Sequence, residues 1–127
     1  MNLDDFMDLV REMNRDAEET LDTANKEYAR DDDKFNNFEI TAYILREVKP
    51  SLKNIQAEDI AFIFMMKHLF SIVKGVSLRE DMRGRFKDCI NYIHLIHGIH
   101  VDKKNAAEQL EKEIEDIDDF ILKNASL

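Results

Sequence analysis

The chain has few residues that bend or break a polypeptide. Its 127 residues include three glycines and one proline, and tryptophan is absent. Because a sheet of many strands needs turn residues at each reversal, this shortage disfavours a many-stranded β fold and favours a few long helices. The length suits one domain with a core of its own. We therefore predict a single all-α domain over residues 1–127.

Cysteine is almost absent too, since Cys89 is the only one. It cannot form an internal disulfide, and its apolar neighbours indicate a core position in a reducing compartment. The first residues, MNLDDFMD, are acidic where a secretory signal peptide is basic. No apolar run approaches the roughly 20 residues that span a bilayer. These observations predict a soluble, cytoplasmic protein without a membrane partner.

Charge is unevenly distributed along the chain. The net charge is −9, yet residues 61–87 contain six Lys or Arg against two acids, so that this segment carries +4 and the remainder −13. So acidic a protein is not expected to hold duplex nucleic acid. Three interpretations stay open: a phosphorylated ligand at the basic segment, an acidic surface that docks on a basic protein, or solubility alone.

Residues 57–97 predict a central helical hairpin. The segment 57–73 is apolar in nearly every helical direction, which predicts a helix buried on all sides. We expect Gly75 to end that helix through a positive φ. Ser77 and Glu80 have the spacing of a capping box, which predicts that the next helix begins there.

The second helix of the hairpin carries two apolar seams. The first comprises Met82, Phe86, Cys89, Ile90, Ile93 and Ile96, and the second comprises Tyr92, Leu95 and Ile99. A helix with two apolar faces is buried on two sides, within a bundle or at a subunit interface. We therefore expect a dimer or higher oligomer that forms through the second seam.

Apolar periodicity predicts the other helices. They are a long amphipathic helix in 1–30, a helix near 38–48 that Pro50 stops, and an acidic helix over 103–124 that follows Gly98 and an Asp102 cap. The core helices thus cover 37–100, and the bundle has about five helices. Three consecutive aspartates at 31–33 indicate a solvated loop.

Two sets of polar side chains are candidate ligands. Asp81 and Asp88 lie seven residues apart with Arg85 between them, which is either an ion-paired helix surface or a carboxylate pair suited to Mg²⁺ and phosphate. His94, His97 and His100 have a spacing that can bind a metal, although packed or hydrogen-bonded histidines give the same pattern. No nucleophile motif and no glycine-rich phosphate loop is present.

Two segments resemble a protein family. Segment 27–40 reads Glu-Tyr, then three aspartates, then Asn-Phe-Glu-Ile, and segment 86–92 reads Phe-Lys-Asp-Cys-Ile-Asn-Tyr. Together they resemble small phage-encoded all-α proteins near the MazG-like nucleoside-triphosphate pyrophosphohydrolases, over roughly 28–95. The family's glycine after the tyrosine is Ala29 here, and its Glu-x-x-Glu metal pattern is absent from the two central helices.

The resemblance implies a nucleotide-handling protein, with Mg²⁺-dependent hydrolysis of a (d)NTP to a monophosphate and pyrophosphate in the host cytoplasm. The residues that would act are Asp81 and Asp88 on Mg²⁺, Lys67, Arg79 and Arg85 on phosphates, and Asn91 and Tyr92 on the base or sugar. The missing metal pattern favours an alternative, a non-catalytic anti-defence protein that sequesters a nucleotide signal or inhibits a host protein through its acidic surface. A purely structural assembly role stays open as well.

Overall fold

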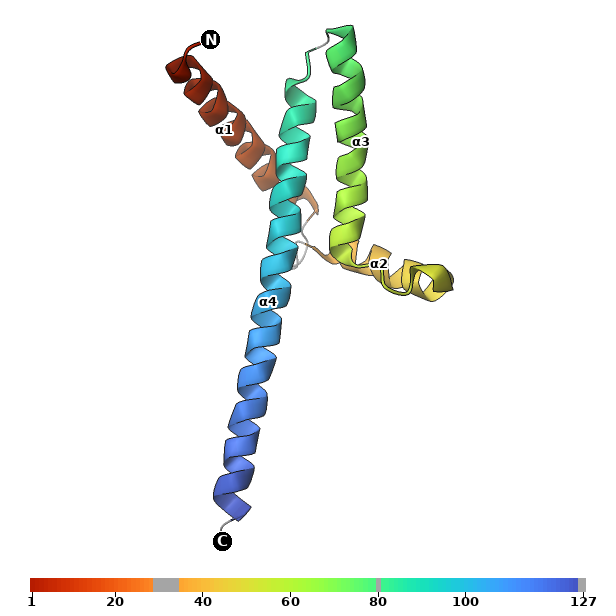
Figure 1. Ribbon diagram of the computed structural model, residues 1–127, viewed down its shortest axis with the longest axis vertical. Helices are drawn as coiled ribbons and strands as arrows, with labels where there is room; N and C mark the ends of the chain where they lie inside the picture. The colour runs from red at the N-terminus through yellow and green to blue at the C-terminus, as the bar shows by residue number, and fades with distance from the viewer. Residues whose placement is uncertain (29–34, 80, 126–127) are drawn as a thin grey trace.

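All regular structure in the described part of the chain is helical. The computed structural model describes residues 1–28, 35–79 and 81–125, with the backbone alone at 24–28 and 77. Its elements are α1 (Leu3–Tyr28), α2 (Asn36–Val48), the short 3-10 helix η1 (Pro50–Leu52), α3 (Ala57–Leu78) and α4 (Arg83–Ala125) (Figure 1). The all-α prediction is confirmed, and none of these residues forms a strand. The aspartate loop predicted at 31–33 lies outside the described residues.

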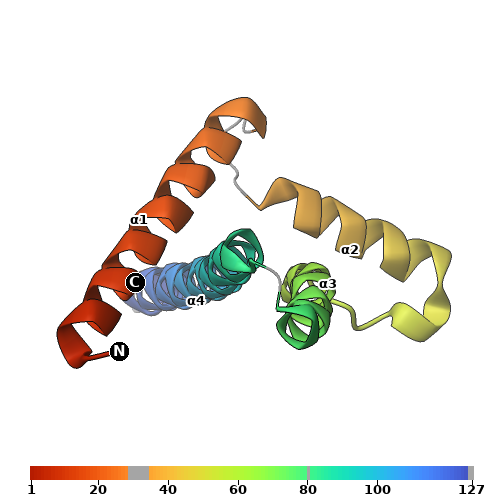
Figure 2. The ribbon, with the colours of Figure 1, turned by 90° about the horizontal axis from the view of Figure 1, so that it is seen from above.

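The predicted hairpin is the centre of an open bundle. Helices α3 and α4 run antiparallel and side by side (Figure 1), α1 crosses the outer side of α4, and α2 lies against α3 (Figure 2). Local signals set two helix ends. Pro50 follows the end of α2 as predicted, and Asp59 Oδ2 accepts a hydrogen bond of 2.8 Å from the Gln56 backbone N–H in a capping box that begins α3.

The prediction of a helix end near Gly98 is wrong, because α4 is one helix of 43 residues. The described ranges therefore hold four α-helices and η1 rather than five helices, and residues 103–124 continue α4. Gly98 has a helical, negative φ. Its missing side chain serves close packing instead, since a Cβ there would lie 2.7 Å from the Phe35 ring.

Gly75 also lies inside a helix and allows close packing, so its predicted role as a helix end is wrong. A Cβ at this position would overlap the side chain of Met82, the residue directly before α4. Helix α3 runs on to Leu78 and is capped by Arg79, a residue in the left-handed conformation with φ 56°. Ser77 thus lies inside α3 instead of beginning the next helix, and Glu80 is outside the described residues.

The core of one chain is small. Its centre is Ala57, Ala61 and Ile99, against which Phe35, Phe38, Tyr92 and Ile96 pack. Tyr92 and Ile99 belong to the second seam of α4, so α3 and its neighbours already cover that seam. A contact between chains therefore needs a surface other than the one we predicted.

The prediction that α3 is buried on all sides is wrong. Ala57, Ile60, Ala61 and Met65 are buried, but Phe62, Phe70 and Val73 are 50%, 66% and 71% exposed. Among the described elements, only α2 and α4 contact α3, and none of them covers its outer side. Among the described residues, no helix combines the length and the apolar character needed to cross a membrane.

The two glycines in α4 provide a stability test. Gly84→Ala should raise the free energy of unfolding by about 0.5 kcal/mol or more, because nothing lies within 4 Å of the new Cβ and alanine favours helix. Gly98→Ala should lower it by about 1 kcal/mol, because the cost of overpacking against Phe35 exceeds that gain. Urea unfolding of both variants measures the difference. Equal stabilisation of both would contradict the close approach of Phe35.

Candidate functional site

Asp88 and Tyr92, two of the predicted site residues, come together with a histidine on α3. His68 Nδ1 lies 3.4 Å from Asp88 Oδ2, and the His68 and Tyr92 ring centroids are 5.4 Å apart. The side chains of His68 and Asp88 are 23% and 40% exposed. This group offers a carboxylate, an imidazole and a phenol on one partly open patch between α3 and α4.

Two neighbouring groups are held in their protonated forms. Burial raises the pKa of the Tyr92 phenol, and the negative charge of Asp88 raises it further. The same two causes, burial first, raise the pKa of the Cys89 thiol. The thiolate is the reactive form of cysteine, and a raised pKa keeps Cys89 in the unreactive thiol form. Cys89 is buried, as we predicted, and serves as a packing residue.

The predicted phosphate-binding cations are not gathered in one place. Arg85 is partly buried, and its Nη1 donates a hydrogen bond of 3.0 Å to the Ser71 carbonyl oxygen, where it ties α4 to α3. Arg79 is exposed at the α3 C-cap, and Lys67 is exposed on α3 next to His68. The sequence had suggested that these three cations act together, but they lie in different parts of the hairpin.

Asp81 does not share a helix face with Asp88, in contrast to our prediction. It precedes α4, and its Oδ1 accepts a hydrogen bond of 3.0 Å from the Arg83 backbone N–H, so that it caps the first turn. Asn91 is buried, and its Oδ1 has no hydrogen-bond partner among the described residues. Its position inside the bundle differs from the surface role in substrate binding that the resemblance implied.

The three histidines with the candidate metal spacing are exposed, so they are not packed in the core. His94, His97 and His100 follow α4 without carboxylate or thiolate neighbours close enough to complete a metal site. Across the described ranges, no three His, Cys, Asp or Glu side chains cluster in a way that could hold a metal ion.

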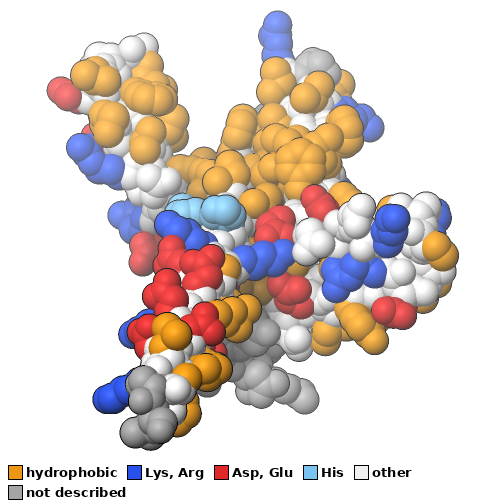
Figure 3. Space-filling view, turned by 60° about the horizontal axis from the view of Figure 1, so that its bottom comes forward, with side chains coloured by type: hydrophobic (Ala, Val, Ile, Leu, Met, Phe, Trp, Pro, Cys, Tyr) orange, Lys and Arg blue, Asp and Glu red, His pale blue; other side chains and the backbone are white. Residues whose placement is uncertain are grey.

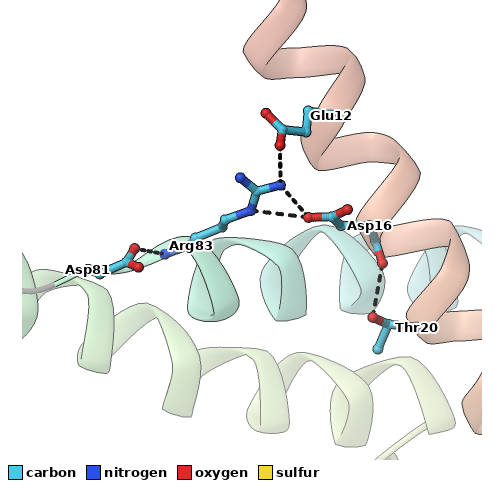
Figure 4. Close-up of polar contacts among 5 residues, drawn as sticks. All are labelled: Glu12, Asp16, Thr20, Asp81 and Arg83. Carbon is cyan, nitrogen blue, oxygen red and sulfur yellow. Dashed lines mark hydrogen bonds and ion pairs between the residues drawn. The ribbon is translucent and has the colours of Figure 1, made fainter.

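Arg83, which sequence analysis did not single out, joins α1 to the hairpin. Its Nε donates a hydrogen bond of 3.1 Å to Asp16 Oδ2, its Nη2 also contacts that oxygen, and Nη2 lies 3.0 Å from Glu12 Oε1 (Figure 4). These hydrogen bonds hold the pKa of Asp16 below its ordinary value. Glu12 and Asp16 are four residues apart on α1, a spacing that places both on one helix face. The spacing does not show that Arg83 is their partner.

Lys103 fastens the other end of the hairpin. Its Nζ donates hydrogen bonds of 2.7 Å to Glu58 Oε2 and 3.2 Å to Gln56 Oε1, both at the start of α3. Burial acts to raise the pKa of Glu58, but the hydrogen bond and charge of Lys103 outweigh it, so the pKa lies below its ordinary value. Beyond Lys103, α4 leaves the other helices.

The last part of α4 forms a free arm, defined here as residues 105–125. Every one of these residues is exposed, and the arm extends past all other helices (Figure 1). It contains seven acids and two lysines, a net charge of −5. Acidic and apolar side chains lie next to each other along it (Figure 3). The arm is thus an exposed amphipathic surface of a kind that monomeric proteins rarely present.

Comparisons with known proteins give no match. No protein-family model, no curated protein and no solved structure is similar to this chain. The similarity of segments 27–40 and 86–92 to phage proteins therefore stays a prediction.

The Arg83–Asp16 contact predicts how stability depends on pH. A carboxyl group with a lowered folded-state pKa stabilises the fold above the unfolded-state pKa, near 3.8, and loses that contribution as pH falls through the folded-state pKa. Asp16→Asn should therefore be less stable than the parent at pH 7, and the difference should shrink towards pH 2. Urea unfolding at a fixed protein concentration measures both.

Asp8→Asn is the matched control, because Asp8 lies on the same helix and its ion pair in the described structure is with Arg11, three residues away on the surface. It should change this profile little. An Asp16→Asn variant with the parent's stability at pH 7 would show that Arg83 does not hold α1 in place.

Proposed function

We propose that the protein acts by binding another protein, and that the free arm of α4 is the binding element. The observation that carries this proposal is that the arm is helical and fully exposed, with an apolar seam that no described residue of its own chain covers. Exposed apolar surfaces of this kind mark interaction sites.

The seam has the geometry of one strand of a coiled coil. It consists of Leu110, Ile114, Ile117 and Ile121, which follow each other at steps of four, three and four residues. Each of these side chains is between 50% and 57% exposed. Such a spacing places apolar side chains in a line that a second helix covers by knobs-into-holes packing.

The charges beside the seam favour a basic partner. Glu111, Glu113 and Asp118 occupy the flanking positions, from which side chains reach across to the partner helix. Two copies of the arm would place acids opposite acids, which disfavours self-pairing. A helix with Lys or Arg at these positions would form ion pairs instead. The partner we propose is therefore a basic amphipathic helix of another protein, which the arm would occupy and block.

This function agrees with the non-catalytic alternative in the sequence, an acidic protein that inhibits a partner. If the resemblance to phage proteins is correct, that partner is a protein of the host. A host protein with an exposed basic helix would lose access to its normal ligand when the arm covers it.

Charge reversal on the arm tests the proposal. The probes are a synthetic peptide with Leu or Ile at its seam positions and Lys at its flanking positions, and a second peptide with Glu in place of each Lys. The parent should bind the basic peptide at least tenfold more tightly, a difference of about 1.4 kcal/mol. The triple variant Glu111→Lys, Glu113→Lys and Asp118→Lys should reverse this preference in isothermal titration calorimetry.

A triple variant of equal charge serves as the control. Glu115→Lys, Asp116→Lys and Asp119→Lys lie away from the seam, and they should leave the preference for the basic peptide in place. If both variants reverse the preference, net charge alone governs binding, and the seam has no specific role. If the parent binds neither peptide, the proposed function is wrong.

The second candidate function is nucleotide handling, and the convergence of Asp88, Tyr92 and His68 favours it. Asp88 would hold Mg²⁺, and the aromatic pair would contact a base. Lys67 is next to His68 in the sequence, and Arg85 is three residues before Asp88, with its guanidinium bound to the Ser71 carbonyl oxygen. The other predicted residues have different settings, since Asp81 caps the first turn of α4, Arg79 ends α3 and Asn91 is buried. The proposed reaction adds one water to a (d)NTP and releases a monophosphate and pyrophosphate.

A thermal-shift panel of triphosphates, monophosphates and cyclic nucleotides, with and without Mg²⁺, tests this candidate. A ligand at 100 times its dissociation constant adds about 2.7 kcal/mol, which is a shift of several degrees. A triphosphate shift that needs Mg²⁺ and that Asp88→Asn removes, while Asp119→Asn on the arm keeps it, would support the enzyme. A Mg²⁺-independent shift with one nucleotide would support sequestration, and no shift would remove this candidate.

A further inference from the structure

One chain exposes more surface than a compact protein of its size. Its accessible surface is 10229 Å², whereas a compact monomer of 15.0 kDa has about 7,000 Å². Ile99 is the only large apolar side chain of the described core that is less than 2% exposed. The arm of α4 supplies part of this excess of roughly 3,000 Å², and an obligate homodimer needs about 1,000–2,500 Å² from the rest of each chain.

Part of this excess lies on an outer seam of α3. We define the outer seam as Phe62, Met66, Leu69, Val73 and Val76, which follow each other at steps of four, three, four and three residues. Phe62, Val73 and Val76 are 50%, 71% and 61% exposed. This alternation of steps is the pattern of a helix that pairs with another helix along its length.

The outer seam lies away from both helices that contact α3. The contacts with α4 and α2 come from the other side of α3, where Phe64 faces Phe38 and His68 faces Tyr92. At about 100° per residue, the outer seam and this inner side point in different directions. Ile63 and Phe70, both more than half exposed, widen the outer seam into a broad apolar face.

We propose that a second copy of this chain covers the outer seam of α3, so that the two hairpins form one intermolecular bundle. Charge favours a second copy here, in contrast to the arm of α4. Between residues 62 and 76, the charged side chains are Lys67 and Lys74, and neither belongs to the outer seam. Two copies related by a two-fold axis would bring identical apolar faces together without opposing like charges.

This inference is independent of the proposed function. The dimer forms through α3 and leaves the arm of α4 free to bind its partner. The dimer is tested by the mass of the protein in solution, whereas the proposed function is tested by peptide binding. A monomer that binds the basic peptide would overturn only the dimer, and a dimer that binds no peptide would overturn only the function.

Sedimentation equilibrium of the full chain tests the proposal. The parent should have twice the mass of one chain at micromolar concentration, and its midpoint of thermal unfolding should rise with protein concentration. Val73→Asp should weaken the dimer at least tenfold, because two carboxylates would be buried in the seam. A monomeric parent, or a parent midpoint that does not depend on concentration, would overturn the proposal.

Val48→Asp on α2 is the matched control. Val48 is 75% exposed, close to the 71% of Val73, so both variants place the same charge on an equally open site of the single chain. The control should keep the mass of the parent. A dimer that survives Val73→Asp, or one that Val48→Asp dissociates just as readily, would show that the interface lies elsewhere. If Val73→Asp fails to fold, the concentration dependence of the parent decides alone.

Discussion

The structure depends on the close approach of α3 and α4, and small residues make that approach possible. Ala57 and Ala61 are fully buried on α3, beside Ile60 and Met65, and Gly98 on α4 admits the ring of Phe35, the residue before α2. Close packing brings many atoms into contact, but small side chains bury little apolar area each. Many large apolar residues of α3, such as Phe62, Phe70 and Val73, are left exposed, and the single chain is held together by a small core.

This constraint explains what sequence analysis predicted well and what it did not. Apolar periodicity identified the helices, because a period near 3.6 is a local property of the chain. It could not show that Gly75 and Gly98 sit inside helices. A glycine that ends a helix and a glycine that accommodates a neighbour look alike in sequence, and only the positions of Met82 and Phe35 distinguish them.

The candidate site shows the same limit. Spacing along one helix suggested a group of Asp81, Arg85 and Asp88, yet each of these residues has a different structural setting. Asp81 caps a helix, Arg85 reaches the Ser71 carbonyl, and Asp88 lies beside His68. Ser71 and His68 are both on α3, so these contacts depend on the register between two helices, which within-helix spacing does not contain. Arg83 was missed for the same reason, since its partners are on α1.

Two uncovered apolar seams remain on one chain, and their charges assign them different partners. Burial of either seam removes apolar area from water, so hydrophobicity alone would let every seam pair with every other. The acids that flank Ile114 and Ile117 make the arm pair poorly with itself, while the outer seam of α3 carries no charge that would prevent self-pairing. The acids of the arm repel the carboxylates of a second arm, but they do not prevent contact with the uncharged outer seam of α3. Lys67, which lies on α3 outside the outer seam, would attract the acidic arm of another chain. A dimer that covers the outer seam would remove that competing contact and leave the arm for its own partner.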